Sequence, residues 1–433
     1  MEESVEPEAP PPRARPVDLL IRFGQRFFVV YFLLMIFPFP LYYVPGISVG
    51  AQAYATGLEQ LTIWVGDTVF NVDASITRTG SGDTTNSYVW LFIRAVLSLV
   101  VATIWMLVAR GRAMSARFFD GVLVYCQLFL ASILLSYGWH KLMPVQFSAP
   151  GPDRLLNSFG QTSPMGLVWV FMGTSAPYQM FAGFGEVLAG LLLFWRRTRL
   201  LGAIIGAVVM ANVAALNYCF DVPVKLSSTH YLLIASIVIA RDFSRLKAFF
   251  ITNQAAPPAE FEPFPVERGW LRHTYLVLKL IVFGYFGFFM AYQNYGMLHE
   301  YGFLKDTGPF HGFYEIESFT RDGLSGREIE DEHRWVRVGI NGRYNGLGAV
   351  RANGYWRRYF FQLDEEQEGA LTMRVRGEEY PMTYEWVEDD VLAFRGQLEG
   401  GEVEIVLRRV PEEQESLLTT RGFHWINEYP FNR

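Results

Sequence analysis

The chain has 433 residues, of which 51% are hydrophobic and 16% aromatic, and its formal net charge is -6. A composition this apolar is typical of a membrane protein. A mildly acidic chain whose arginines occur in small clusters beside apolar segments has no basic surface for nucleic acid, so no nucleic-acid partner is expected.

Seven apolar segments are long enough to span a membrane, since a spanning helix needs about 20 mostly apolar residues. They are residues 24–44, 87–109, 118–141, 176–195, 199–220, 229–249 and 270–293. Small residues at GxxxG spacing, Gly202 and Gly206, predict close helix packing. The acidic, proline-rich residues 1–20 are expected to form a disordered cytoplasmic tail.

The distribution of lysine and arginine predicts the orientation of these spans. Basic residues cluster on the flanks facing one side, as at 110–117 and 196–199. The opposite flanks hold only Arg78, Lys141, Arg154 and Lys225. Because cytoplasmic flanks carry the excess of positive charge, the N-terminus is predicted to be cytoplasmic and everything after residue 293 to lie outside.

Two long connections, 45–86 and 142–175, share the predicted outer face. The apolar part of "FGQTSPMGLVWVFMGTSAP" in the second connection is too short to span, so it is expected to lie in the interface or to re-enter. Both connections are predicted to fold over the outer mouth of the helices. In the first, "TGSGDTT" has the glycines of a phosphate loop but not its lysine, which favours a turn.

Residues 305–433 have the pattern of a soluble sheet. "YFFQL", "LTMRVRG", "MTYEWV", "VLAFRGQL" and "VEIVLRR" alternate in polarity and are separated by turn sequences such as "DEEQEG" and "EGG". Regular spacing of about ten residues predicts an antiparallel β-barrel or curled sheet. The terminal "RGFHWINEYPFNR" is expected either to cap this domain or to dock on the membrane surface.

Ionisable residues within apolar spans are the candidates for function, because each costs roughly 2.5 to 3.5 kcal/mol on insertion scales and needs a partner or a watery cavity. One interpretation is a set of structural ion pairs, for example Glu186 with Arg94 or Lys279. The other is a polar cavity open to the outer face. The candidate ligand-binding residues are His140, Lys141, Glu186, Asn217, Asp221, Lys225 and His230.

Redox and metal motifs are not evident. Cys126 and Cys219 lie in separate apolar segments without a CxxC partner, which argues against dithiol chemistry. His299, His311, His333 and His424 lack metal-ligand spacing, and no haem, flavin, iron–sulfur or zinc motif is present. No catalytic triad can be picked from the sequence, since a triad is a spatial arrangement.

Three stretches, "SYGWHKLMPVQF", "FGEVLAGLLLFWRRTRLLGAIIGAVVMANVAALN" and "FDVPVKLSSTHYLL", resemble the DoxX family of bacterial membrane proteins. The resemblance covers about 118–250 and implies a four-helix bundle in a bacterial inner membrane. The family positions fall on Lys141, Leu142, Glu186 and 196–198. Founding members are associated with thiosulfate:quinone oxidoreductase, and others are accessory proteins. A looser resemblance is to the membrane domain of vitamin K-dependent γ-carboxylases, which also place a β-rich domain outside the membrane.

The predicted organisation is therefore a membrane α-helical bundle followed by an extracytoplasmic β domain. Its parts are a tail (1–20), two leading spans (21–117), the DoxX-like bundle (118–250), a linker with a seventh span (251–304) and the β domain (305–433).

Three functions remain open. The first is binding of a quinone or another isoprenoid or lipid-like ligand at an outer polar site, where His140, Lys141 or His230 could donate hydrogen bonds. The second is a non-catalytic assembly or chaperone subunit whose β domain binds a membrane or periplasmic protein by edge pairing or in a groove. The third is transport of a small solute.

Overall fold

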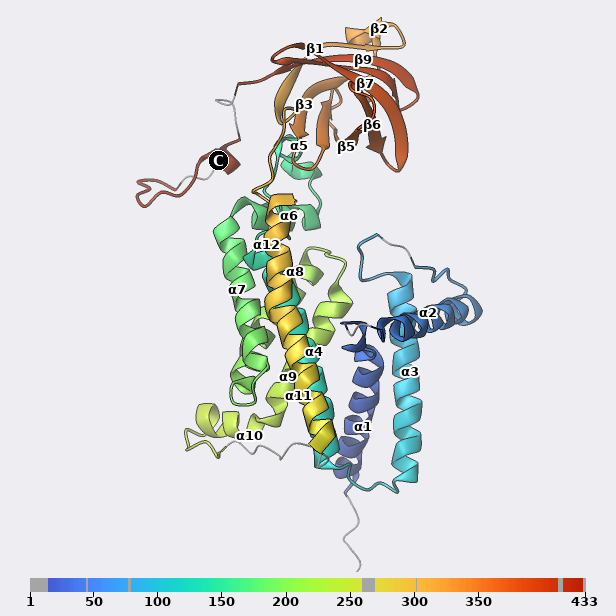
Figure 1. Ribbon diagram of the computed structural model, residues 1–433, viewed down its shortest axis with the longest axis vertical. Helices are drawn as coiled ribbons and strands as arrows, with labels where there is room; N and C mark the ends of the chain where they lie inside the picture. The colour runs from blue at the N-terminus through green and yellow to red at the C-terminus, as the bar shows by residue number, and fades with distance from the viewer. Residues whose placement is uncertain are drawn as a thin grey trace, which may run out of the picture. The chain divides into compact units, whose positions relative to one another are not determined.

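The structure is a computed structural model that describes residues 15–43, 46–76, 79–258, 269–300, 302–411 and 416–430. The chain forms two compact units, the first from 1–137 and 185–290 and the second from 138–184 and 291–433. The first unit is helical, and the second contains an antiparallel β-barrel (Figure 1). Most of the predicted tail 1–20 lies outside the described residues, but its end is helical because α1 begins at Pro16, which suits the first turn of a helix.

The first unit is built from helices. They are α1 (Pro16–Ile36), η1 (Leu41–Tyr43), α2 (Ser48–Val65), η2 (Gly66–Phe70), α3 (Thr85–Val108), α4 (Ala116–Leu142), α7 (Ala176–Leu193), α8 (Arg199–Cys219), α9 (Lys225–Arg241), α10 (Phe243–Leu246), η4 (Lys247–Ile251), α11 (Gly269–Gly284) and η5 (Tyr285–Phe289). The boundary between the units passes through α4 and α7, and again at the start of α12 (Met290–Glu300). Helix α2, in the first of the two long connections, runs roughly perpendicular to α3 (Figure 1).

Five helices in the described part of the chain are long and apolar enough to cross a membrane. They are Pro16–Tyr43, Thr85–Val108, Ala116–Leu142, Arg199–Cys219 and Gly269–Glu300. The spans predicted at 176–195 and 229–249 are the shorter helices α7, with 18 residues, and α9, with 17. Helix α9 stops at Arg241 because Asp242 leaves helical geometry and its carboxylate binds Arg245 at 2.8 Å and Arg199 at 3.4 Å.

Small residues bring α4, α7 and α8 into close contact. A Cβ on Gly190 of α7 would lie 2.8 Å from Cγ of Leu135 on α4, and one on Gly202 of α8 would lie 2.8 Å from the backbone nitrogen of Leu193 on α7. Neither site has room for a larger residue. The close packing predicted from the glycine spacing of 202–206 is thus confirmed at Gly202.

The second unit contains short helices and a sheet. The helical elements are α5 (Pro152–Leu155), η3 (Phe159–Gln161), α6 (Pro164–Thr174), α12, η6 (Gly326–Glu328) and α13 (Leu417–Thr420). The strands are β1 (Gly312–Arg321), β2 (Leu324–Ser325), β3 (Trp335–Asn341), β4 (Gly346–Arg351), β5 (Trp356–Leu363), β6 (Ala370–Val375), β7 (Glu378–Glu388), β8 (Val391–Leu398) and β9 (Gly401–Arg409). Strands β5 to β9 are the five that alternation predicted, and β1, β3 and β4 extend the sheet beyond them.

The barrel closes because its first and last long strands pair. Each strand from β3 to β9 is antiparallel to the next, and β1 pairs with β3 on one side and with β9 on the other, with Tyr314 opposite Arg409. The eight long strands therefore all have two neighbours, and β2 is a short hairpin partner of β1. Closure removes the free sheet edge that the edge-pairing hypothesis required.

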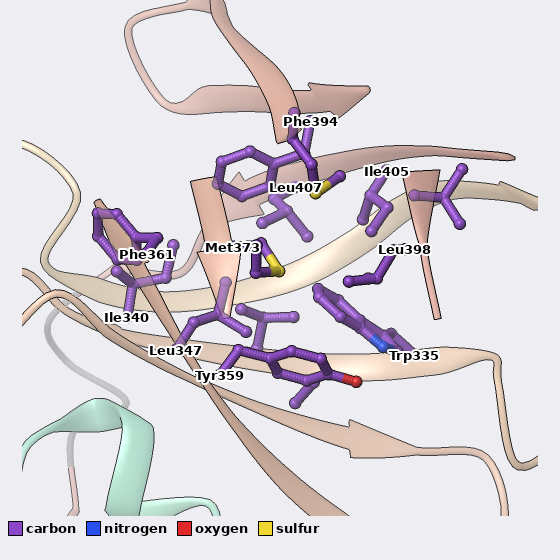
Figure 2. Close-up of a cluster of buried hydrophobic side chains, with 14 of the residues drawn as sticks. Trp335, Ile340, Leu347, Tyr359, Phe361, Met373, Phe394, Leu398, Ile405 and Leu407 are labelled. Carbon is purple, nitrogen blue, oxygen red and sulfur yellow. The ribbon is translucent and has the colours of Figure 1, made fainter. Parts of the chain in front are cut away.

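Side chains fill the barrel. Alternate residues of each strand point inward, and Figure 2 shows Trp335, Leu347, Tyr359, Met373 and Phe394 meeting in one packed cluster. Most of these side chains are completely buried. The interior is thus a hydrophobic core and not a ligand channel.

The predicted outer connection 142–175 packs against the outside of the barrel. Its helix α5 lies so close to β3 and β4 that a Cβ on Gly339 or Gly348 would collide with backbone oxygens of Pro152 and Asp153. The Asp153 carboxylate lies 2.8 Å from Nη2 of Arg358, and Nε1 of Trp356 donates to the Asp153 carbonyl at 2.8 Å. This segment therefore belongs with the β domain.

Candidate functional site

The seven predicted ligand-binding residues are divided between the two units. His140 and Lys141 are in the second unit, and Glu186, Asn217, Asp221, Lys225 and His230 are in the first. Lys141 and Glu186 are buried, and each of His140, Lys141 and Glu186 has an interaction partner. The partner of Glu186 is not assigned to Arg94 or Lys279, so the structural pairs remain a prediction.

Asp221 and Lys225 form an ion pair. Asp221 ends the turn after α8 with a left-handed backbone (φ 52°), and its Oδ1 lies 2.8 Å from Nζ of Lys225, one turn along. The hydrogen bond from the ammonium to Asp221 raises the pKa of Lys225. The Asp221 side chain is 85% exposed, so this pair lies at the surface of the unit.

A second carboxylate, Asp83, holds the start of α9 from a distant part of the sequence. Its Oδ2 accepts from the backbone N–H of Lys225 at 2.8 Å and its Oδ1 from that of Leu226 at 3.0 Å. The preceding Gly82 donates its N–H to the Pro223 carbonyl at 2.8 Å. The "TGSGDTT" segment is therefore a turn, as predicted, and it supplies the negative charge that a helix N-terminus favours.

Asn217 joins α8 to α9. Its Nδ2 donates to Oγ of Ser228 at 3.0 Å, and that hydroxyl donates in turn to backbone carbonyls at the start of α9. Both side chains are buried. Asn217 therefore acts as a link between two helices.

His230 is in a buried hydrogen-bonded chain with Tyr31. Nδ1 of His230 lies 2.6 Å from the Leu226 carbonyl, which can only accept, so Nδ1 carries a proton. In the neutral ring, Nε2 then accepts from the hydroxyl of Tyr31, also at 2.6 Å. The two rings are stacked nearly parallel, with 5° between their planes. Helices α1 and α9 are thus joined through a phenol and an imidazole.

Arg94 of α3 lies over the same tyrosine. Its guanidinium carbon is 4.8 Å from the centre of the Tyr31 ring and 6.0 Å from that of Trp90. The residue is 7% exposed, and its Nε has no hydrogen-bond partner. Arg94 is therefore a buried cation held by aromatic rings.

Tyr31, Arg94 and His230, which we call the Tyr–Arg–His cluster, lie at one end of the helical unit. Each lies roughly one to three helical turns from the end of its helix. For α9 and α3 this is the end that faces the Asp83 turn. The cluster presents several guanidinium donors and a phenol that can transfer a proton to an imidazole. Sequence reasoning singled out Arg94 and His230 but missed Tyr31 and Asp83, because a tyrosine in an apolar segment and an aspartate in a loop have no distinguishing local signal.

A pocket of about 510 Å³ lies at one mouth of the barrel. Its wall includes Phe310, Leu363, Tyr384 and Trp386, with Asn345 and Glu368 among the polar groups. The ring of Phe310 contacts those of Tyr384 and Trp386, with centroids 5.1 and 5.7 Å apart. This is an aromatic recess at the surface of a filled barrel.

One group of side chains has the spacing of metal ligands. Ligand atoms of Glu330, Glu332 and His333 lie within 4.8 Å of one another. Both glutamates are exposed, and His333 lies 3.4 Å from Glu332 as an ion-pair partner. Exposed acidic groups of this kind need no metal, so the group is not assigned as a site.

Comparison with known proteins finds one informative similarity. A segment of 125 residues is 35% identical to the uncharacterized protein YwoB of Bacillus subtilis (strain 168) and covers 29% of this chain and 79% of that protein. No protein-family model matches the chain. No solved structure matches it.

Proposed function

The chain belongs to the same family as the uncharacterized protein YwoB, and we propose that it is an integral membrane protein that binds a quinone, or another isoprenoid or lipid-like ligand, at the Tyr–Arg–His cluster. The observation that supports this proposal is the buried guanidinium of Arg94, which stacks on Tyr31 and whose Nε has no hydrogen-bond partner. Ionisable residues within membrane spans are candidates for ligand sites, because burying a charge there is costly.

The donors of the cluster restrict the chemistry of the ligand. Guanidinium offers only N–H donors, so the polar group of the ligand must accept hydrogen bonds. A quinone carbonyl meets this requirement and is neutral, which lowers the cost of bringing it into an apolar region. The Tyr31–His230 hydrogen bond provides a path by which a proton can reach or leave such a carbonyl.

The resemblance to the DoxX family supports the same ligand class. We propose that α4, α7, α8 and α9 form the DoxX-like four-helix bundle, with seven spans in all, and the close contacts of Gly190 and Gly202 support this arrangement. In this proposal the protein lies in a bacterial inner membrane, with its N-terminus cytoplasmic and the barrel outside. The Tyr–Arg–His cluster then lies in the outer half of the membrane.

The other predicted residues have different places in this proposal. His140, Lys141 and Glu186 remain predicted ligand contacts. Asn217 links α8 to α9, and the exposed Asp221–Lys225 pair marks the end of the unit through which a ligand would enter.

Titration of the purified full-length protein with a short-chain quinone, followed by difference spectra, tests this proposal. Arg94→Gln should weaken binding at least tenfold, since removing one hydrogen bond from a charged group costs roughly 1.5 to 3 kcal/mol. Arg26→Gln is a matched control, because Arg26 is also buried in an apolar helix but donates to backbone carbonyls of Arg22 and Arg112, away from the cluster. Equal binding by both variants and the wild type would exclude the cluster as the site.

A second function is favoured by the aromatic pocket at the barrel mouth. If the protein is an assembly subunit, the partner must dock in a groove, since the closed barrel offers no sheet edge. Substitution of Trp386 by alanine should then abolish co-purification of a membrane or periplasmic protein and leave quinone binding unchanged. Loss of quinone binding in this variant would instead place the ligand at the barrel.

A further inference from the structure

We propose that the C-terminal segment 417–430 is an interfacial anchor that inserts its aromatic side chains into the headgroup region of the bilayer. The segment follows the barrel and takes no part in it. Trp425 is 91% exposed and Tyr429 is 85% exposed, and Phe423 and Ile426 are similarly open. The tail does not cap the barrel, which removes one of the two alternatives that the sequence left open.

The segment has the composition of a membrane-interface element. Tryptophan and tyrosine combine an apolar ring with a polar group, and for this reason they concentrate where lipid meets water. A soluble surface rarely exposes four such large apolar side chains within seven residues. Local contacts give the segment a defined turn, since the rings of Phe423 and Trp425 lie 5.0 Å apart and Nη2 of Arg421 donates to Oδ1 of Asn427 at 2.6 Å.

The strand register brings the end of the last strand beside the start of the first, where the chain arrives from the helix Gly269–Glu300. Tyr314 of β1 pairs with Arg409 of β9, and the N–H of Val410 donates to the Phe313 carbonyl at 2.8 Å. The chain therefore leaves the barrel at the mouth by which it entered. Entry at Gly312 follows closely on Glu300, the end of the apolar helix Gly269–Glu300.

The connection between the barrel and the anchor sets how far the anchor can extend. Leu417 lies eight residues after Arg409, and an extended chain of that length spans at most about 29 Å. The chain turns at the end of α12, where the N–H groups of Gly302 and Leu304 donate to carbonyls of that helix. The barrel begins shortly afterwards in the sequence, at Gly312. The chain that comes from the membrane helix and the chain that leads to the anchor thus meet the barrel at the same mouth.

The charge of the segment identifies the kind of bilayer. Its only formally charged residues are Arg421 and Glu428, which cancel. Partition then depends on aromatic and aliphatic burial and needs no anionic lipid. A zwitterionic phosphatidylcholine bilayer is therefore sufficient as the partner.

Depth-dependent quenching in the full-length protein tests the anchor. An environment-sensitive dye is attached at Glu428→Cys in a Cys126→Ala, Cys219→Ser background, and the protein is placed in phosphatidylcholine nanodiscs with a nitroxide near the headgroups of the lipid. We expect a blue-shifted emission that the nitroxide quenches. The same dye at Gln397→Cys, on β8 at the far mouth of the barrel, should stay red-shifted and unquenched.

Two further variants make the result decisive. Replacing Phe423, Trp425 and Tyr429 together by serine should remove both the blue shift and the quenching at position 428, with the barrel unchanged. A red-shifted, unquenched dye in the parent protein would overturn the anchor. A blue-shifted dye that lipid does not quench, and that Trp386→Ala turns red, would also overturn it by placing the segment in the barrel pocket.

Discussion

The hydroxyl of Tyr31 lies 2.6 Å from Nε2 of His230, although the two residues are 199 positions apart in the sequence. The bond joins α1 to α9, and Arg94 of α3 stacks on the same tyrosine ring. Three apolar helices thus contribute one polar side chain each to a buried cluster. Because a buried polar group needs a partner, this cluster both orients the helices and provides donors for a ligand.

Tyr31→Phe separates these two roles. The variant keeps the ring under Arg94 but leaves Nε2 of His230 without its donor, which should cost about 1 to 3 kcal/mol of unfolding free energy. Thermal melting in detergent measures this loss. Tyr218→Phe is the control, since its exposed hydroxyl bonds only Thr229, and it should change stability by no more than about 0.5 kcal/mol. Equal stability of the two variants would mean that the buried hydrogen bond contributes nothing.

Asp83→Ala should weaken the start of α9. The carboxylate caps two backbone N–H groups there, so the substitution should cost about 1 to 2 kcal/mol. Asp221→Ala breaks only an exposed ion pair and should cost less than about 0.5 kcal/mol. Hydrogen–deuterium exchange of 225–230 distinguishes them: faster exchange is expected in the Asp83 variant alone. The same exchange in both would show that the long-range cap is not needed.

Asp153→Asn should detach the 142–175 connection from the barrel. Asp153 is 1% exposed and pairs with the partly exposed Arg358, so the substitution leaves a guanidinium without its counter-ion in a confined site. We expect the free energy of unfolding to decrease by an amount near the low end of the roughly 3 to 5 kcal/mol seen for broken buried pairs. Protease sensitivity of 142–163 should rise. Glu385→Gln, which breaks an exposed pair with Arg395, serves as the reference and should leave cleavage unchanged.

The barrel should lose stability in mild acid because of His311. Burial, with the nearby Arg343, lowers the pKa of His311 below its usual value. A histidine with a depressed folded-state pKa is held neutral in the native state, so its contribution is complete above the unfolded pKa of about 6.5 and declines as pH falls below it. The melting temperature of the barrel should therefore fall as the pH is lowered from about 7 to about 5. His311→Gln should flatten this dependence, whereas His424→Gln, on the exposed tail, should not.

Reporter fusions test the predicted orientation. A fusion after Asn253 should be active in the cytoplasm, and one after Lys305 should be active outside, because basic residues such as Arg241, Arg245 and Lys247 lie on the flank before the first site. If the second fusion is also cytoplasmic, the barrel and its aromatic tail face the cytoplasm, and the outer-leaflet site is excluded.

Local patterns in the sequence determined the elements of this protein. Apolar segments of sufficient length gave the helices Thr85–Val108, Ala116–Leu142 and Arg199–Cys219, and polar–apolar alternation gave strands β5 to β9. The Asp221–Lys225 pair was also predictable, since it joins residues one helical turn apart. Each of these features depends on the spacing of neighbouring residues, which a single sequence displays.

Tertiary structure decided everything that joins distant residues. The glycines in β3 and β4 interrupt the alternation that would have predicted these two strands. The packing of α5 shows their role, because Gly339 and Gly348 leave room for the backbone of that helix. Likewise Asp83 caps a helix 142 residues away, and Tyr31 meets His230 across the unit. The sequence records which polar side chains are present, but their partners depend on how helices and strands pack, and packing is determined by contacts between residues that no local spacing relates.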